Sequence, residues 1–247
     1  MGRIIVILLL FLVGFFIFLA NRSGEIGVNS PIPKVFGKTD NAKVNTWFPR
    51  EKLGSLNGDL IITAKSALAV DYESGEILLS RNYKSRLPVA STLKIMTALV
   101  ALENLNPATE LGVLEKAATA GENSMGLTAG EKLTVEELLY GLMLVSGNDA
   151  AVVLAEGVAG SEGNFVDMMN RKARDLGLSD TKFVNATGLD VDENNSYSTA
   201  YDMAVIAHYT WENFPIFRKI SSTAHQYIEA TPNPKAFALY NATNLLT

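Results

Sequence analysis

The segment Pro88–Leu99 reads Pro-Val-Ala-Ser-Thr-Leu-Lys-Ile-Met-Thr-Ala-Leu. A helix can begin here, because proline is tolerated at a first helical turn, serine and threonine are good N-caps, and helix formers follow without a break. On such a helix Ser91 and Lys94 are three residues apart, so their side chains share a face. A partly desolvated lysine can act as the base for a serine nucleophile. The segment therefore predicts a helix to about Glu103 that presents a hydroxyl and an amine together.

The Ser-x-x-Lys pattern is short and needs support from the rest of the chain. It occurs a second time at Ser179–Lys182, but that copy follows Gly177 in a polar stretch with no helix after it, so it predicts a loop. Ser-x-Asn occurs three times, at 55–57, 80–82 and 146–148. Of these, the copy at Ser146–Asn148 lies downstream of Ser91 in a setting that suits a site.

The Ser146-Gly147-Asn148 segment is expected to join two apolar helices. A capping box at Thr134–Glu137 opens the first helix, whose apolar residues recur at helical spacing. Asp149 is expected to cap the second helix, which runs to about Val158. The turn would then present two polar side chains, Ser146 and Asn148, from a buried region. The alternative is a plain helix–helix turn, for which glycine and asparagine are typical.

Composition excludes several classes of function. The 247 residues are 48% hydrophobic, which suffices for one large domain or two small ones. A net charge of −5 disfavours a nucleic-acid partner. The absence of cysteine excludes disulfides and thiol catalysis. His208 and His225 are too few for a histidine-rich metal site, and each is expected to be a surface or packing residue.

The N-terminal region predicts export and a tether. After Arg3, the segment 4–20 contains no charged residue, and its length falls between a signal-peptide core and a full membrane span. We therefore expect a signal anchor or a cleaved signal peptide over residues 1–20, with the anchor favoured and a buried core helix as a third alternative. Residues 21–60 are rich in Gly, Asn, Ser, Pro and Lys, which is typical of a flexible linker. The folded domain is expected over residues 61–247.

Further elements are expected from periodicity and turn residues. Two strands around a turn at 72–75 predict a hairpin over Ser66–Ser80. Helices are expected over Ser161–Leu176, with Gly177 as the stop, and from a second capping box at Thr199–Asp202 to about Trp211. A short helix at 214–220 and a strand at 224–228 are expected next.

From about Ser66 onward, the chain resembles the serine-type D-alanyl-D-alanine carboxypeptidases, the low-molecular-mass penicillin-binding proteins. The resemblance rests on four segments in the family's order and approximate spacing: Pro88–Thr97, Leu142–Ala150, Phe183–Asp190 and Tyr197–Ala204. It implies a mixed α/β (α+β) fold of the β-lactamase/transpeptidase type. In that fold an antiparallel sheet is flanked by helices and accompanied by a helical subdomain.

The resemblance also implies the chemistry. Ser91 would attack the D-Ala-D-Ala bond of a peptidoglycan stem peptide, with Lys94 as the base. Ser146 would relay a proton to the leaving group, and Asn148 would bind the substrate amide or orient Lys94. No metal or organic cofactor would be needed. β-Lactams would be covalent inhibitors, and the protein would lie in the cell envelope, at the outer face of the cytoplasmic membrane or in the periplasm, tethered by its N-terminal segment.

One departure from the family pattern concerns its third element. The family's Lys-Thr-Gly strand should follow the segment that resembles Tyr240–Leu246, and the sequence ends at Thr247. We therefore expect a C-terminally truncated chain with an incomplete sheet, which would be inactive as given.

Three alternatives stay open at this point. A D,D-endopeptidase acting on peptidoglycan cross-links would use the same residues. A class A β-lactamase would need a glutamate after Ser-x-Asn to drive deacylation, and no equivalent stands out after Val158. A non-catalytic envelope protein that binds wall peptides is the third alternative.

Overall fold

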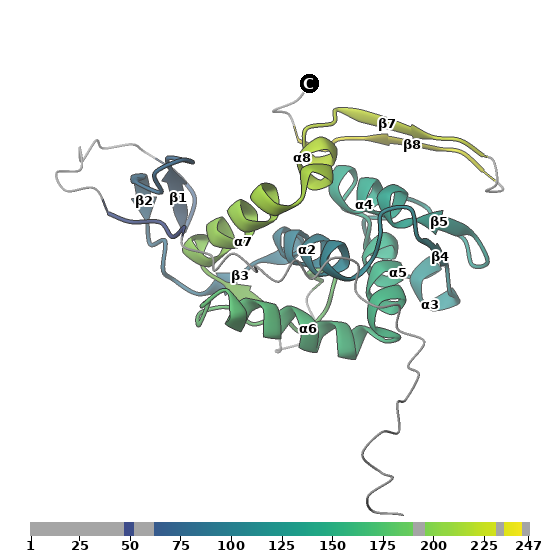
Figure 1. The fold of residues 1–247 in the computed structure, drawn as a ribbon, viewed down its shortest axis with the longest axis horizontal. Helices are drawn as coiled ribbons and strands as arrows, with labels where there is room; N and C mark the ends of the chain where they lie inside the picture. Colours follow the sequence, from purple (N-terminus) through teal and green to yellow (C-terminus); the bar gives the residue numbers. More distant parts are fainter. Residues whose placement is uncertain (1–46, 52–61, 190–195, 231–234, 244–247) are drawn as a thin grey trace, which may run out of the picture. The chain divides into compact units, whose positions relative to one another are not determined.

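The computed structural model describes residues 47–51, 62–189, 196–230 and 235–243, all within the compact unit Phe36–Thr247 (Figure 1). The predicted signal segment 1–20 and most of the predicted linker 21–60 lie outside the described residues. In the part that is described, no helix has the length and apolar character needed to cross a membrane.

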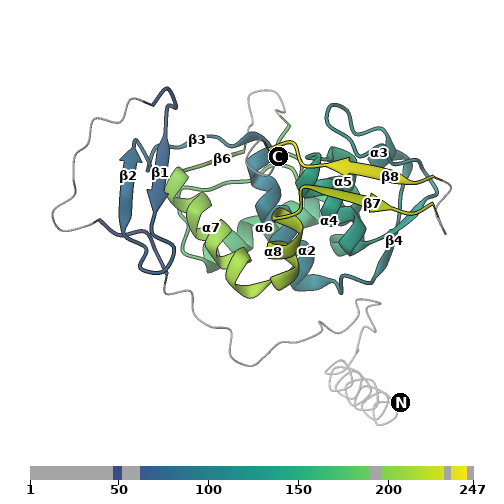
Figure 2. The same cartoon turned by 90° about the horizontal axis from the view of Figure 1, so that it is seen from above.

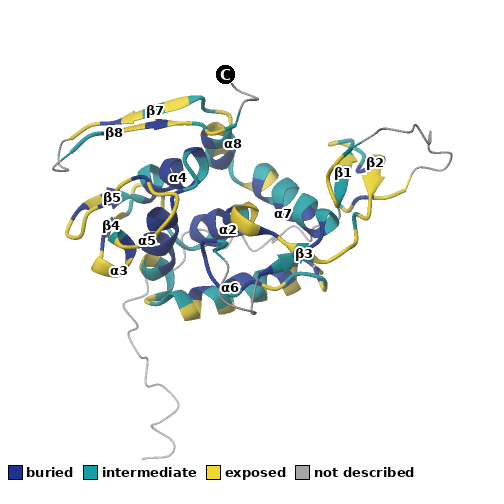
Figure 3. Cartoon of the chain, turned by 180° about the vertical axis from the view of Figure 1, so that it is seen from behind, coloured by how far each residue is buried: buried dark blue, intermediate teal, exposed yellow. Residues whose placement is uncertain are grey.

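Helix α2 (Lys94–Asn104) is the centre of the fold and has α4, α5, α6 and α7 around it (Figures 1 and 2). Burial extends around most of this helix: Lys94 and all residues from Met96 to Leu102 are buried, and Ile95 is half-buried. Met96 and Leu99 are fully buried, and Val100 and Ala101 are buried as well (Figure 3). A helix enclosed on all sides is apolar all round. Its first residue, Lys94, is therefore buried too.

Two of the surrounding helices, α4 and α6, begin at the capping residues that the sequence indicates. The capping box of α4 (Val135–Leu144) forms as predicted between Thr134 and Glu137. Ser161 caps α6 (Glu162–Asp175), and Gly177 follows that helix with φ +77°. The remaining helices are α3 (Glu115–Ala118), α5 (Asn148–Ala159), α7 (Ala200–Asn213) and α8 (Pro215–Ser221).

The second predicted capping box forms only in part. Thr199 accepts a hydrogen bond from the Asp202 backbone N–H at the start of α7, as expected. The Asp202 carboxylate, however, accepts a hydrogen bond from the Thr181 hydroxyl at 2.7 Å. The acidic side chain thus connects α7 to the chain segment before it.

The strands of the described residues form four antiparallel pairs. The predicted hairpin is β1 (Ala67–Val70) with β2 (Ile77–Arg81), and the predicted strand at 224–228 is β7 (His225–Ile228), which pairs with β8 (Phe237–Tyr240). Two further pairs are β3 (Leu87–Pro88) with β6 (Tyr197–Ser198) and β4 (Glu110–Gly112) with β5 (Lys132–Thr134). The mixed α/β class is confirmed, and the expected antiparallel sheet is represented by these separate pairs.

Five residues of the predicted linker have a defined conformation. The Arg50 N–H donates to the Gly75 carbonyl at 2.9 Å, and the Arg50 carbonyl accepts from the Ile77 N–H at 2.9 Å. Within the predicted linker, Arg50 is thus bound to the hairpin through its backbone. The backbone groups of the hairpin turn supply hydrogen bonds that composition did not reveal.

Candidate active site

Ser91 and Lys94 come together on a tight turn that leads into α2. Residues Ala90–Leu93 form a 3₁₀ turn, in which side chains three positions apart eclipse each other. Ala90 has φ +45°, a left-handed conformation that strains a non-glycine residue and recurs at functional sites. The turn leaves Ser91 exposed and Lys94 only 2% exposed. The pairing predicted from the sequence is present, although a 3₁₀ turn rather than an α-helical cap creates it.

The Lys94 side chain has three hydrogen-bond partners. Its Nζ lies 3.1 Å from the Ser91 Oγ, 2.7 Å from the Asn148 Oδ1 and 2.7 Å from the Thr187 backbone carbonyl oxygen. The amide and carbonyl oxygens can only accept hydrogen bonds, whereas the serine hydroxyl can donate or accept. A neutral Lys94 amine that donates to both oxygens therefore directs its lone pair at the Ser91 hydroxyl.

The charge state of Lys94 suits this role. Burial lowers the pKa of Lys94 from 10.5 to about 8, against the opposing effects of the Glu122 and Asp149 carboxylates. The neutral amine is the form that can accept the serine proton. With a pKa of about 8, roughly one molecule in ten holds Lys94 neutral at pH 7.

The lowered pKa predicts how acylation depends on pH. Because the neutral amine is the active form, the rate of Ser91 acylation should rise about tenfold per pH unit below pH 8 and level off above it. The measurement is the second-order rate constant for benzylpenicillin acylation between pH 6 and pH 10. A rate that is constant between pH 6 and pH 8, or that falls, would contradict a neutral Lys94 as the base.

Asn148 is fixed from two sides. It is the first residue of α5 and is 2% exposed. Its Oδ1 accepts from Lys94, while its Nδ2 donates to the Gly121 carbonyl at 2.9 Å. The amide orientation is therefore set by a loop that precedes α4, and the predicted role of Asn148 in orienting Lys94 has a geometric basis.

Ser146 stands apart from this network. It has φ +57°, and its Oγ is buried without a hydrogen-bond partner among the described residues. An unpaired buried hydroxyl costs free energy, and such groups concentrate at functional positions. The structure thus brings Ser91, Lys94 and Asn148 together by hydrogen bonds, and it leaves the hydroxyl of Ser146 free to bind another group.

The loop 183–189 supplies the carbonyl that holds Lys94. Asn185 fixes the turn, because its Oδ1 accepts from the backbone N–H groups of Thr187 and Gly188. Gly188 has φ +85°, and a Cβ there would lie 2.1 Å from the Ala90 carbonyl oxygen. Only glycine allows the loop to approach the serine turn this closely.

Sequence reasoning missed the Thr187 carbonyl and misassigned Asp149. Asp149 was predicted to cap α5, but Gly147 is the N-cap and makes no side-chain cap. The fully buried Asp149 carboxylate instead accepts hydrogen bonds from the backbone N–H groups of Met125, Gly126 and Leu127. Any residue type can supply a backbone N–H or carbonyl group, so the sequence does not indicate such partners directly. Only the polar and glycine residues of the two loops could have indicated them.

The second Ser-x-x-Lys copy, Ser179–Lys182, lies in a loop, as predicted. Lys182 pairs with Tyr197 through two backbone hydrogen bonds of 2.9 Å. Its neighbour Thr181 contacts Ser198 and Asp202. The segment joins a loop to β6 and has no part in the site.

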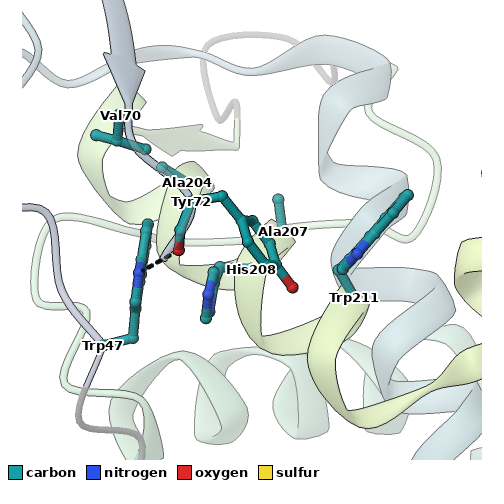
Figure 4. A pocket seen from close by; sticks show the side chains of 7 residues that line it. All are labelled: Trp47, Val70, Tyr72, Ala204, Ala207, His208 and Trp211. Carbon is teal, nitrogen blue, oxygen red and sulfur yellow. Dashed lines mark hydrogen bonds between the residues drawn. The ribbon is translucent and has the colours of Figure 1, made fainter. Parts of the chain in front are cut away.

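A pocket of about 530 Å³ lies elsewhere, where β1 meets α7 (Figure 4). Its lining is almost entirely apolar and comprises Trp47, Val70, Tyr72, Ala204, Ala207, His208 and Trp211. His208 stacks on Trp47 with ring centroids 3.9 Å apart, and burial lowers the pKa of His208. Burial and the hydrogen bond to Glu212 raise the pKa of Tyr72 to about 12. These environments favour a neutral imidazole and a neutral phenol, so the prediction of His208 as a packing residue agrees with its contacts.

The described residues define a class of protein. Serine acyl-transfer enzymes that use lysine as the base share one arrangement. They have a serine on a turn that leads into a helix, a buried lysine three residues later, and an asparagine two residues after a second serine. Among the described residues, no group of three or more His, Cys, Asp or Glu side chains could hold a metal ion.

Comparisons with known proteins give the family. The family model described as D-alanyl-D-alanine carboxypeptidase, peptidase S11, matches residues 55–247. The chain is 38% identical over 198 residues to D-alanyl-D-alanine carboxypeptidase DacF of Bacillus subtilis. This match covers 78% of the chain and 50% of DacF. The chain belongs to the D-alanyl-D-alanine carboxypeptidase family.

Solved structures agree with this assignment. The crystal structure of a D-alanyl-D-alanine carboxypeptidase from Mycobacterium tuberculosis has a TM-score of 0.73 at 32% identity, covering 80% of this chain and 73% of that chain. A variant of the DD-transpeptidase of Streptomyces K15 has a TM-score of 0.69 at 31% identity, covering 76% of this chain and 77% of that chain. The chain spans about half the length of the curated relatives it matches.

Proposed function

We propose that this protein is a serine-type D-Ala-D-Ala carboxypeptidase that removes the terminal D-alanine from peptidoglycan stem peptides. The observation that carries the proposal is the placement of Lys94, whose Nζ lies 3.1 Å from Ser91 and is held by two acceptor oxygens at 2.7 Å. Family membership supports the substrate class, since the relatives are named for this activity.

The proposed reaction has two stages. Ser91 Oγ attacks the carbonyl carbon of the D-Ala-D-Ala bond while Lys94 takes the hydroxyl proton. Ser146 then relays this proton from Lys94 to the departing D-alanine nitrogen as the C–N bond breaks, which leaves an acyl-enzyme on Ser91 and a neutral Lys94. Water attacks the acyl carbon and gives a proton to Lys94. Lys94 returns that proton to the Ser91 Oγ as the ester bond breaks, which releases the shortened peptide and restores the serine hydroxyl.

Each side chain has a role that its environment supports. Asn148 orients the Lys94 amine through its Oδ1 and is itself held by the Gly121 carbonyl. The Ser146 hydroxyl is free of hydrogen bonds to the described residues and so is available to a leaving group. The expected oxyanion donors are the Ser91 backbone N–H and a donor on a Lys-Thr-Gly strand.

The proposal extends to the setting of the enzyme. Residues 61–247 are assigned to the transpeptidase-like catalytic domain, 21–60 to a linker that is ordered at 47–51, and 1–20 to a signal peptide or anchor. The protein would act in the cell envelope, with β-lactams as covalent inhibitors of Ser91. The family's role in wall-peptide processing supports this location.

The test compares two substrates on the full-length protein. We expect release of D-alanine from a stem pentapeptide at a rate well above that of cleavage of a cross-linked peptide dimer. Preferential cleavage of the dimer would instead establish the D,D-endopeptidase alternative. Release of neither product, with penicillin binding retained, would favour a non-catalytic wall-binding protein.

A further inference from the structure

Thr97 lies three residues after Lys94 on α2 and is fully buried. A threonine inside a helix can satisfy its hydroxyl within that helix, at the carbonyl three or four residues earlier. The Thr97 hydroxyl instead points out of the helix and donates to the Ala186 backbone carbonyl at 2.8 Å. The bond therefore connects α2 to the loop 183–189, across a sequence separation of 89 residues.

Thr97 and Lys94 hold neighbouring carbonyls of this loop. The Lys94 Nζ donates to the Thr187 carbonyl at 2.7 Å, and the Thr97 hydroxyl donates to the carbonyl of the residue before it. Residues three positions apart share a face of a helix, so both donors reach the same stretch of backbone. The Thr97 bond thus holds the loop against α2 at the residue next to the Lys94 acceptor.

The other side chains seen to hold this loop lie outside α2, Lys94 excepted. Asn170 on α6 donates to the Phe183 carbonyl at 2.8 Å and accepts from the Phe183 N–H at 2.9 Å. Asn185 forms the turn within the loop itself. These bonds fix where the loop begins and how it turns, whereas Thr97 fixes it to the helix that carries the base.

The Ala186 carbonyl depends on the Thr97 hydroxyl. Ala186 is fully buried, and no second donor to its carbonyl is present among the described residues. A buried carbonyl that loses its donor pays the cost of desolvation without a hydrogen bond in return. Without the hydroxyl, the loop is therefore expected to move until this carbonyl reaches water, and the adjoining Thr187 carbonyl moves with it.

We propose that Thr97 is a positioning residue for acylation, whose hydroxyl holds the loop 183–189 in place so that the Thr187 carbonyl can orient the Lys94 amine. This inference rests on the proposed function and adds a residue that acts through Lys94 rather than on the substrate. With its acceptor displaced, the amine is free to rotate, and its lone pair points at the Ser91 hydroxyl for a smaller part of the time.

The test measures acylation of the full-length protein by benzylpenicillin after Thr97→Val, which removes the hydroxyl and keeps the branched shape. The acylation rate constant should fall about tenfold or more, because a misplacement of about 1 Å can cost about 10²-fold. The dissociation constant of the non-covalent complex should stay unchanged. Thr97→Ser keeps the hydroxyl and should recover most of the rate. A variant that folds only in part labels to a lower final extent, whereas the rate constant reports the folded molecules alone.

Thr210 on α7 provides a matched control. It is also fully buried, but its hydroxyl donates to the Ile206 carbonyl of its own helix at 2.7 Å. Thr210→Val should leave the acylation rate constant unchanged. A smaller loss in Thr97→Val than expected, a loss that Thr97→Ser does not recover, or an equal loss in Thr210→Val would overturn the role of Thr97 and leave the proposed function intact. A wild-type protein that is not acylated would overturn the proposed function, and this inference with it.

Discussion

Replacing Lys94 with methionine is expected to slow the acylation of Ser91 by about 10²- to 10⁴-fold, the usual contribution of a positioned general base. Methionine matches the unbranched shape of the lysine stem but carries no lone pair that can take the serine proton. Lys94→Arg should be equally slow, because a guanidinium keeps its donors and its charge at every accessible pH. The measurement is the rate of acylation by benzylpenicillin under pseudo-first-order conditions.

A second buried lysine provides the control for this prediction. Lys172 is largely buried beside Glu103 and Tyr209, between α6 and its neighbours, and has no contact with the site. Lys172→Met should lower the free energy of unfolding, since Glu103 loses its partner, yet leave the acylation rate unchanged. Acylation of folded Lys94→Met within tenfold of the wild-type rate would rule out Lys94 as the base.

Replacing Gly188 with alanine is expected to reduce acylation by about 10²-fold or more, the loss seen when one oxyanion donor is misplaced. The new Cβ would lie 2.1 Å from the Ala90 carbonyl oxygen and 2.8 Å from the Ser91 backbone nitrogen. Because these are backbone atoms, the main chain at one or both segments must move. That movement displaces both the serine turn and the neighbouring Thr187 carbonyl that holds Lys94. The acylation rate and the free energy of unfolding should be measured together.

Gly177→Ala separates backbone strain from the effect on the site. Gly177 has φ +77°, close to the φ of +85° at Gly188, but nothing lies within 4 Å of a Cβ built there. Alanine at this position should cost about 1 kcal/mol of stability through strain and leave acylation intact. If both variants lost stability equally and both kept the wild-type acylation rate, the close approach of Gly188 would have no role in the site.

Local signals in the sequence sufficed for much of the helical framework. The capping residues Thr134, Ser161 and Thr199 each mark a real helix start, because a cap acts through the backbone of its own next turn. The Ser91–Lys94 pairing was predictable for the same reason. By contrast, the pairing of β4 with β5 depends on residues 20 to 24 positions apart, and its three-residue strands carry no periodicity.

The parts of the site that escaped prediction depend on backbone groups distant in sequence. The Thr187 carbonyl lies 93 residues from Lys94, and any residue type could supply it. Asp149 looked like a helix cap because its position fits one, yet its carboxylate satisfies a loop more than 20 residues upstream. The positive φ angles at Ala90, Glu122 and Ser146 likewise could not be predicted, because these residue types give no signal for the left-handed conformation.

The most direct test asks whether Ser91 becomes acylated. The full-length protein should be incubated with a fluorescent penicillin, digested, and the labelled peptide identified by mass spectrometry, alongside Ser91→Ala. We predict one label on the peptide that contains Ser91 and none in the variant. A wild-type protein that takes up no label, or a label that persists in Ser91→Ala, would contradict the central claim that Ser91 is the nucleophile of this site.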